Sequence, residues 1–224
     1  MAQKKTLQTK AKAKPMAKPI VKKSLTKAKA KPKTKPKVRK MVRGFKPKIR
    51  IENVVASISV DAEIDLDKLA ASLPSAEYEP EQFPGLVLRL EDPKSAILVF
   101  SSGKMVCTGA KAPKFIKIAI DKTIKLIRST GIKIRGPPTI TIQNIVASSD
   151  LCVELNLDRI AFALQNAEFE PEQFPGLVFR VFDPKVVFLL FRSGKIVCTG
   201  AKKRIDLDRG VQKLITELRR IKVV

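Results

Sequence analysis

Hydrophobic and polar residues alternate with a period of two along residues 49–60. Val54, Ala56 and Ile58 fall on one side of this segment, and Asn53 and Val55 fall on the other. A strand with apolar side chains on both sides is either covered on both faces or presents one face to a partner. The pattern therefore predicts a β-strand whose second face is available for binding or for a further packing layer.

The segments that follow predict further strands and two helices before the pattern starts again. A short helix begins near Asp65, and a longer one over residues 113–129 has isoleucines on one side and Gly131 at its end. Tight turns at residues 92–94 and 101–104 separate three of the strands. The predicted strands are residues 49–60, 86–90, 96–100, 105–108 and 132–135, and residues 136–138 are predicted to link the two halves. One meander of strands with helices at both ends is typical of an α+β fold.

The chain contains this arrangement twice, at an offset of 91 residues. Residues 51–111 and 142–202 share 36 identities in 61 positions, and Glu-Pro-Glu-Gln-Phe-Pro-Gly-Leu-Val occurs in both. We divide the chain into a basic tail (1–48), a first repeat (49–136) and a second repeat (137–224). A single pair of repeats is too short for a solenoid, so the two halves are expected to present one joint surface.

The period of two also predicts which strand residues share the face opposite the helices. This face is mostly Val and Leu, with a few Asn and Thr, with Arg and Lys near the strand ends, and without any carboxylate. Its members are Asn53, Val55, Val87, Arg89, Leu98, Phe100, Lys104, Val106 and Thr108, and then Asn144, Val146, Val178, Arg180, Leu189, Phe191, Lys195, Val197 and Thr199. The pattern alone is equally compatible with a face buried by another sheet, a helix layer or a second subunit.

Two features favour nucleic acid as the partner of this face. The duplicated cations suit phosphate better than a dry core, and Asn and Thr among Val and Leu suit the minor groove, whose bases present acceptors. Phe83 and Phe174 sit beside Pro-Gly in the loops, while Phe100 and Phe191 end strands. A single Phe is usually core, but four in two matched pairs favour insertion between base steps.

The charge of the chain is concentrated in its first 50 residues, which carry 20 Lys or Arg and no Asp or Glu. Residues 51–224 carry 25 basic and 21 acidic groups. The Lys/Ala/Pro-rich tail is predicted to be disordered, because it has too little apolar surface to offset the entropy of ordering. We expect it to attract polyanions without sequence preference; the alternative is a solubilising or targeting extension.

Residue usage excludes several other classes of protein. There is no histidine, no CxxC pair among the three cysteines and no apolar run long enough to span a membrane. The absence of histidine removes the commonest general base and metal ligand, so we expect no metal site, and we expect no membrane association. The cysteine pattern suggests a reducing compartment, with Cys107 and Cys198 as small buried hydrophobic residues.

With these motifs in place, the chain resembles the TATA-box binding protein family over nearly all of residues 49–224. The resemblance rests on Asn-Val-Val-Ala/Asn-Ile-Val-Ala, Phe-Pro-Gly-Leu-Val, Asp-Pro-Lys, Phe-x-Ser-Gly-Lys and Val-Cys-Thr-Gly-Ala-Lys, each present twice. Because both loops read Glu-Pro-Glu-Gln-Phe-Pro-Gly, it is closer to the archaeal branch, although the Lys-rich tail is not a family feature. The family is itself a standard example of minor-groove insertion and kinking.

The resemblance implies a saddle made of one curved ten-stranded antiparallel sheet with four helices on its convex side. It implies a general transcription initiation factor that binds the TATA box and is not an enzyme, with no catalytic residues and no cofactor. The residues that it implies for DNA are the intercalating Phe83, Phe100, Phe174 and Phe191; the base-contacting Asn53, Asn144, Thr108 and Thr199 with an apolar floor of Val55, Val106, Val146, Val197, Leu98 and Leu189; and the phosphate-contacting Arg89, Lys104, Lys111, Arg180, Lys195 and Lys202.

The resemblance also implies protein partners. Transcription factor B would bind the second loop at Glu170 and Glu172, and RNA polymerase would follow indirectly. The location would be the cytoplasm or nucleoid in an archaeon and the nucleus in a eukaryote. Rival interpretations are an RNA-recognition sheet, which lacks its mid-strand aromatic motif here, and a DNA glycosylase, for which there is no catalytic helical domain. An architectural chromatin protein, which the tail favours, would bind DNA without base preference.

Overall fold

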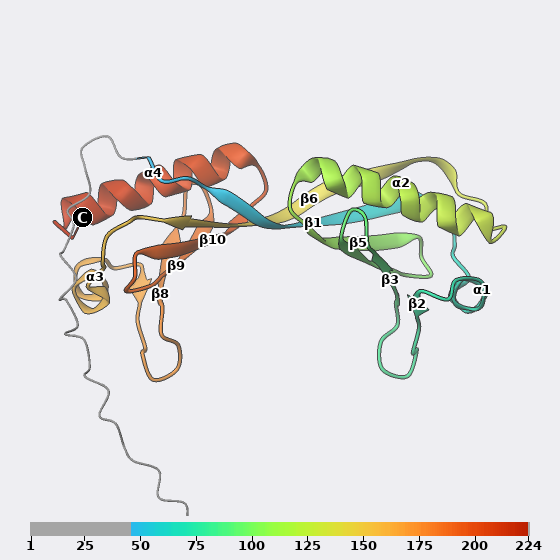
Figure 1. Ribbon diagram of the computed structural model, residues 1–224, viewed down its shortest axis with the longest axis horizontal. Helices are drawn as coiled ribbons and strands as arrows, with labels where there is room; N and C mark the ends of the chain where they lie inside the picture. Colours follow the sequence, from blue (N-terminus) through green and yellow to red (C-terminus); the bar gives the residue numbers. More distant parts are fainter. Residues whose placement is uncertain (1–45, 224) are drawn as a thin grey trace, which may run out of the picture. The chain divides into compact units, whose positions relative to one another are not determined.

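The computed structural model describes residues 46–223, and these form one antiparallel sheet of ten strands with four helices (Figure 1). The first repeat contains β1 (Arg50–Asp61), α1 (Leu66–Ser72), β2 (Ala76–Glu77), β3 (Leu86–Leu90), β4 (Ser95–Val99), β5 (Lys104–Ala110) and α2 (Pro113–Ser129). The second contains β6 (Arg135–Asp150), α3 (Leu157–Ala163), β7 (Ala167–Glu168), β8 (Leu177–Val181), β9 (Val186–Leu190), β10 (Lys195–Ala201) and α4 (Arg204–Arg220). The predicted α+β saddle is confirmed. The predicted disordered tail, residues 1–48, lies outside the described residues except for residues 46–48.

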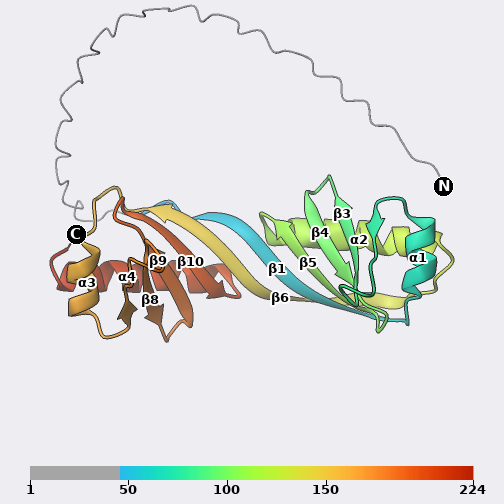
Figure 2. The ribbon, with the colours of Figure 1, turned by 90° about the horizontal axis from the view of Figure 1, so that it is seen from below.

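The order of the strands is symmetric about the centre of the sheet: β2-β3-β4-β5-β1-β6-β10-β9-β8-β7. Figure 2 shows β1 and β6 crossing the middle side by side, with β3 to β5 at one end and β8 to β10 at the other. Each outer group is a meander of antiparallel strands, as the tight turns in the sequence predict.

One face of the sheet packs on the two long helices, because alternate strand residues are apolar. Val54, Ala56 and Ile58 of β1 are buried, and so are Ile116 and Ile120 of α2. The helix α4 has the same role in the second repeat, where its Leu207, Val211, Leu214, Ile215 and Leu218 are buried. The 17-residue helices α2 and α4 lie along one side of the sheet, while the 7-residue α1 and α3 lie at its two ends (Figure 1).

The joint between the repeats differs from the prediction. The short strand expected at residues 132–135 is wrong, and the residues 136–138 expected to be a linker belong to β6. The 16 residues of β6 pair with β1 along nearly all of its length, from Asp61 opposite Arg135 to Arg50 opposite Ser148. Pro137 and Pro138 are tolerated because this half of β6 pairs with β1 alone; β10 pairs only from Ile145 onward.

Candidate nucleic-acid interface

The face opposite α2 and α4 is a half-buried apolar floor built from matched rows across the strands. In the first repeat, the register places Val87 opposite Leu98, Leu98 opposite Val106, and Val106 opposite Ser57. The second repeat repeats this row with Val178, Leu189, Val197 and Ser148. Residues directly opposite one another in a sheet share a face, so the register puts each predicted floor residue on this surface. Val55 and Val146 continue the floor through the centre, opposite Asn144 and Asn53 respectively.

The two asparagines at the centre are held in a defined orientation. Oδ1 of Asn53 accepts the backbone N–H of Gly109 at 2.7 Å, and its Nδ2 donates to Oγ1 of Thr108 at 3.1 Å. Asn144 repeats both bonds, with Gly200 at 2.8 Å and Thr199 at 3.0 Å. Because a backbone N–H can only donate, it identifies Oδ1 and fixes the amide group against a flip. Each side chain therefore keeps an N–H donor at the middle of the apolar floor.

The four phenylalanines form two edge-to-face pairs at the ends of the floor. The ring centroids of Phe83 and Phe100 are 5.8 Å apart, and those of Phe174 and Phe191 are 6.0 Å apart. Phe83 and Phe174 remain 37% and 38% exposed, although each contacts a second ring. Edge-to-face packing stiffens such a pair, which gives a rigid apolar edge at each end of the sheet.

Gly85 and Gly176 make room for these pairs, a role that we did not assign from the sequence. A Cβ atom at Gly85 would lie 2.7 Å from Cε1 of Phe83, and one at Gly176 would lie 2.6 Å from Cε1 of Phe174. In the sequence, the pattern that could have indicated this role is Phe-Pro-Gly, which occurs in both repeats.

Two of the predicted phosphate-contacting cations already have partners. Arg89 donates two hydrogen bonds of 3.1 Å to the carboxylate of Glu77, and Arg180 donates bonds of 3.4 and 3.3 Å to Glu168. The hydrogen bond from Arg89, together with its charge, lowers the pKa of Glu77 below its ordinary value and keeps the carboxylate ionised. The same pairing raises the pKa of Arg89. Arg89 and Arg180 are thus on the predicted face, but neither is an isolated positive charge.

The four predicted lysines are exposed at the margins of the floor. Lys104 and Lys195 begin β5 and β10, next to the turns that follow Phe100 and Phe191. Lys202 follows β10 and donates to Oε1 of Gln143 at 3.3 Å. No ion pair involves any of these lysines, or Lys111, within residues 46–223.

The prediction that this face lacks carboxylates is wrong. Glu77 lies opposite Val87, and Glu168 lies opposite Val178, so both glutamates are on the floor side at the outer edges. The two-residue strands β2 and β7 that carry them are too short for a periodic pattern to reveal. In the sequence, the pattern that could have indicated these strands is Ala-Glu, which occurs at the same place in both repeats.

A third carboxylate reaches across the centre of the sheet. Oε1 of Glu52 accepts the hydroxyl of Ser148 at 2.5 Å, while Gln143, its equivalent in the second repeat, donates to Ser57 at 2.7 Å. The side chain that bonds to the serine is therefore a charged carboxylate in the first repeat and a neutral amide in the second.

The loops that carry Phe83 and Phe174 are turns held by backbone bonds. The N–H groups of Gln173 and Phe174 both donate to the carbonyl oxygen of Glu170 at 3.0 Å, and the first loop repeats this arrangement around Glu79. The side chains of Glu170 and Glu172 are exposed, and neither forms an ion pair within the described residues. The second loop thus presents two unneutralised carboxylates.

Cys107 and Cys198 are buried in the core. Burial raises the pKa of Cys107 to about 11 and that of Cys198 to about 12, so both remain thiols at ordinary pH. No group of His, Cys, Asp or Glu that could hold a metal occurs between residues 46 and 223. None of the helices in this range is long and apolar enough to cross a membrane.

These features define a class of protein: a two-repeat α+β saddle with helices on one face of its β-sheet and an apolar opposite face that has a phenylalanine pair at each end. The chain is 50% identical over 178 residues to the TATA-box-binding protein of Pyrobaculum calidifontis, covering 80% of this chain and 89% of the relative. It is 51% identical over 171 residues to that of Pyrococcus abyssi, covering 76% and 90%. A solved structure, Methanococcus jannaschii TBP, matches with a TM-score of 0.73 and 52% identity, covering 78% of this chain and 99% of the other.

The family is defined by a model that matches the chain twice, over residues 48–130 and 139–221. This chain belongs to the family described as transcription factor TFIID (or TATA-binding protein, TBP). The predicted family and its archaeal-like character are confirmed, since the relatives above are archaeal.

Proposed function

We propose that this protein binds the TATA box of promoter DNA in the minor groove and acts as a general transcription initiation factor. The relatives named TATA-box-binding protein support this function. The observation that carries it is the placement of fixed amide donors at the centre of an apolar floor with a phenylalanine pair at each end.

Base recognition follows from the central donors. In the minor groove, A·T and T·A pairs present only acceptors at A N3 and T O2, whereas G·C pairs add the N2 amino donor of guanine. Asn53 and Asn144 keep a donor directed away from their partners Thr108 and Thr199. The floor of Val and Leu cannot pair with a guanine amino group, so a G·C pair there would leave that donor buried and unpaired. The site is therefore selective for A·T pairs.

Deformation of the DNA follows from the phenylalanine pairs. A flat apolar floor needs an opened groove, and the four Phe rings open it by inserting between base steps at the two ends. Lys104, Lys111, Lys195 and Lys202 at the margins contact the phosphates on either side. Arg89 and Arg180 contribute a phosphate contact only by exchanging Glu77 and Glu168 for it, because these carboxylates hold them in the free protein.

The experiment that tests this function measures DNA binding and bending by single phenylalanine variants. Phe174→Ala and Phe191→Ala should each weaken binding to a TATA duplex and reduce the bend reported by fluorescence transfer between dyes at the two DNA ends. Phe162→Ala is the matched control, because Phe162 lies on α3 and is 94% exposed. A duplex that is bent equally by all of the variants would show that the rings are not the wedges, and equal affinity of the unaltered protein for TATA and scrambled duplexes would refute the proposed function.

We also propose that the second loop recruits transcription factor B, and through it RNA polymerase. Two unneutralised carboxylates beside a DNA-binding phenylalanine are unfavourable near phosphates, and a basic protein surface docked on Glu170 and Glu172 would offset this cost. Glu170→Arg with Glu172→Arg should leave binary DNA binding intact or tighter and abolish the ternary complex in a gel-shift titration. The matched control is Glu79→Arg with Glu81→Arg in the first loop, which should spare the ternary complex. Equal loss from both loops would contradict a special role for the second.

A further inference from the structure

The two ends of the binding face carry grooves of the same construction. At the second-repeat end, a groove is lined by Arg50, Ser148, Phe191, Lys195 and Val197, among others. At the first-repeat end, the equivalent groove is lined by Thr141, Ser57, Phe100, Lys104 and Val106. Ten of the twelve residues that line each groove are repeat equivalents of residues in the other, at the offset of 91. A comparison of the two grooves therefore shows at which positions the two ends of the face differ.

The difference is one of charge. Lys46, Lys48, Arg50 and Lys195 line the second-repeat groove together with one carboxylate, Asp150. The first-repeat groove is lined by a single cation, Lys104, and no carboxylate. Thr139 and Thr141 occupy the positions that correspond to Lys48 and Arg50. A surplus of positive charge thus stands at one end of an otherwise matched surface.

Two of these extra cations are well placed for a phosphate. Arg50 lies opposite Ser148 in the row that contains Val197, so it continues the floor to its margin, and its side chain is 79% exposed. Its nearest acid, Glu52, lies 3.9 Å away and is already bonded to Ser148. The hydroxyl of Ser149 donates to the backbone carbonyl of Lys48 at 2.9 Å, which holds the chain there against the sheet. Ile58, the equivalent of Ser149, has no hydroxyl with which to form this bond.

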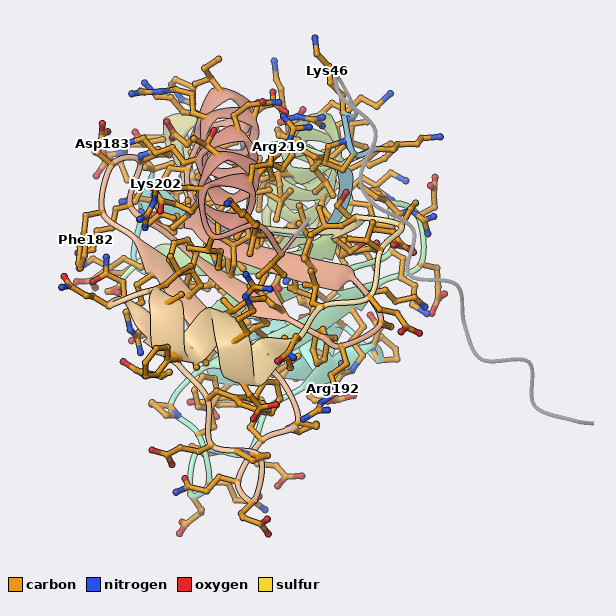
Figure 3. All side chains as sticks on the ribbon, turned by 90° about the vertical axis from the view of Figure 1, so that its left-hand side faces the viewer. Lys46, Phe182, Asp183, Arg192, Lys202 and Arg219 are labelled. Atoms are coloured by element: carbon orange, nitrogen blue, oxygen red, sulfur yellow. The ribbon has the colours of Figure 1, made fainter. Side chains whose placement is uncertain are left out.

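We propose that Lys48 and Arg50 form a phosphate site at the second-repeat end of the face, which binds the DNA backbone flanking the box and so orients the saddle on the DNA. This proposal rests on the proposed function. Lys46, labelled in Figure 3, marks the same end, where the described chain begins. Because the first-repeat end has threonines at the equivalent positions, a duplex that extends beyond the box on one side is bound with the second repeat toward that extension.

The test uses the full chain and a box that reads the same on both strands, so that the box itself imposes no direction. The duplex extends well beyond the box on one side only. A donor dye is attached at Ser129→Cys, at the end of α2, in a Cys152→Ser background, since the other two cysteines are buried. Fluorescence transfer to an acceptor on the extended end then reports the fraction of complexes in each orientation.

We expect the second repeat to face the extension in about a five-fold excess, the factor that two solvent-exposed ion pairs together supply. Lys48→Thr with Arg50→Thr copies the first-repeat residues, keeps good strand formers and should reduce the excess at least two-fold. Thr139→Lys with Thr141→Arg builds the site at the other end and should also reduce it. Lys117→Gln with Lys125→Gln on exposed positions of α2 removes the same charge and should leave the excess unchanged.

The salt dependence of binding provides an independent readout. Loss of two phosphate contacts should reduce the log–log slope by about 1.8 in the Lys48/Arg50 variant and not in the α2 control. An orientation ratio and a slope that are the same in all four proteins would overturn the proposal. Failure of the proposed function is distinguishable, because the unaltered protein would then bind a scrambled duplex with the same flanks equally well.

Discussion

Replacing Asn53 or Asn144 by aspartate removes one donor group at the centre of the face and adds one negative charge, with little change in the size of the side chain. The two side chains have the same shape, and the remaining oxygen of Asp still accepts the N–H of Gly109 or Gly200. The hydroxyl of Thr108 lies 3.4 Å from Oδ1 of Asn53 and can donate to a carboxylate in its place. The fold should therefore survive, with a change in the free energy of unfolding of no more than about 1 kcal/mol.

The effect on DNA binding should be much larger. The variant loses one hydrogen bond to a base, about 0.5–1.5 kcal/mol, and leaves two acceptors facing each other in a desolvated groove, about 1–3 kcal/mol more. The sum is roughly 1.5–4.5 kcal/mol, or about a 10- to 2,000-fold loss of affinity for each asparagine. The carboxylate would be least unfavourable opposite a G·C pair, whose amino group can donate, so discrimination between A·T and G·C should fall as well.

The assay is fluorescence anisotropy at fixed salt, with a TATA duplex and a duplex in which the central pairs are G·C, alongside a thermal melt of each protein. Asn156→Asp is the matched control, because Asn156 caps α3 by accepting the N–H of Arg159, and its repeat equivalent is already Asp65. That variant should melt and bind as the unaltered protein does. If Asn53→Asp folds normally and binds the TATA duplex within three-fold of the unaltered protein, the central amides are not the base-reading donors.

Three further outcomes are expected. Gly176→Ala forces the ring of Phe174 out of its edge-to-face pair, so it should weaken DNA bending while a melt shows a change of less than about 2 kcal/mol in stability; full bending would contradict the packing role of this glycine. Glu77→Gln releases Arg89, so DNA binding should tighten at low salt and its log–log salt slope should steepen by about one, and an unchanged slope would mean that Arg89 never contacts phosphate. In native protein at pH 8, a thiol reagent should modify Cys152 alone, because Cys107 and Cys198 are buried with raised pKa values; all three should react in denaturant, and modification of more than one thiol in the folded state would contradict this burial.

The sequence by itself determined the repeat, most of the elements of each half and the apolar members of the floor. These follow from short-range regularities: alternation places Val54 and Val55 on opposite faces, and the duplicated turns force β3, β4 and β5 into one meander. Helix α2 was predictable to the residue, since Pro113 suits its first turn and Gly131 follows its end. The four phenylalanines were found because they recur in identical surroundings.

The tertiary structure decided what depends on contacts between distant segments. Glu77, the partner of Arg89, lies on a two-residue strand that no periodic pattern reveals. The sequence therefore predicted Arg89 as a cation available for phosphate, whereas in the structure its charge is paired with that of Glu77. The Gly-Pro-Pro of residues 136–138 indicates a linker locally, yet β6 runs through it because only β1 requires its hydrogen bonds there. Above all, β1 and β6 cross the centre side by side, so the first residues of the first repeat lie at the far end of the second. Lys48 and Arg50 are therefore beside Phe191 and not Phe100, a placement that only the pairing of β1 with β6 could establish.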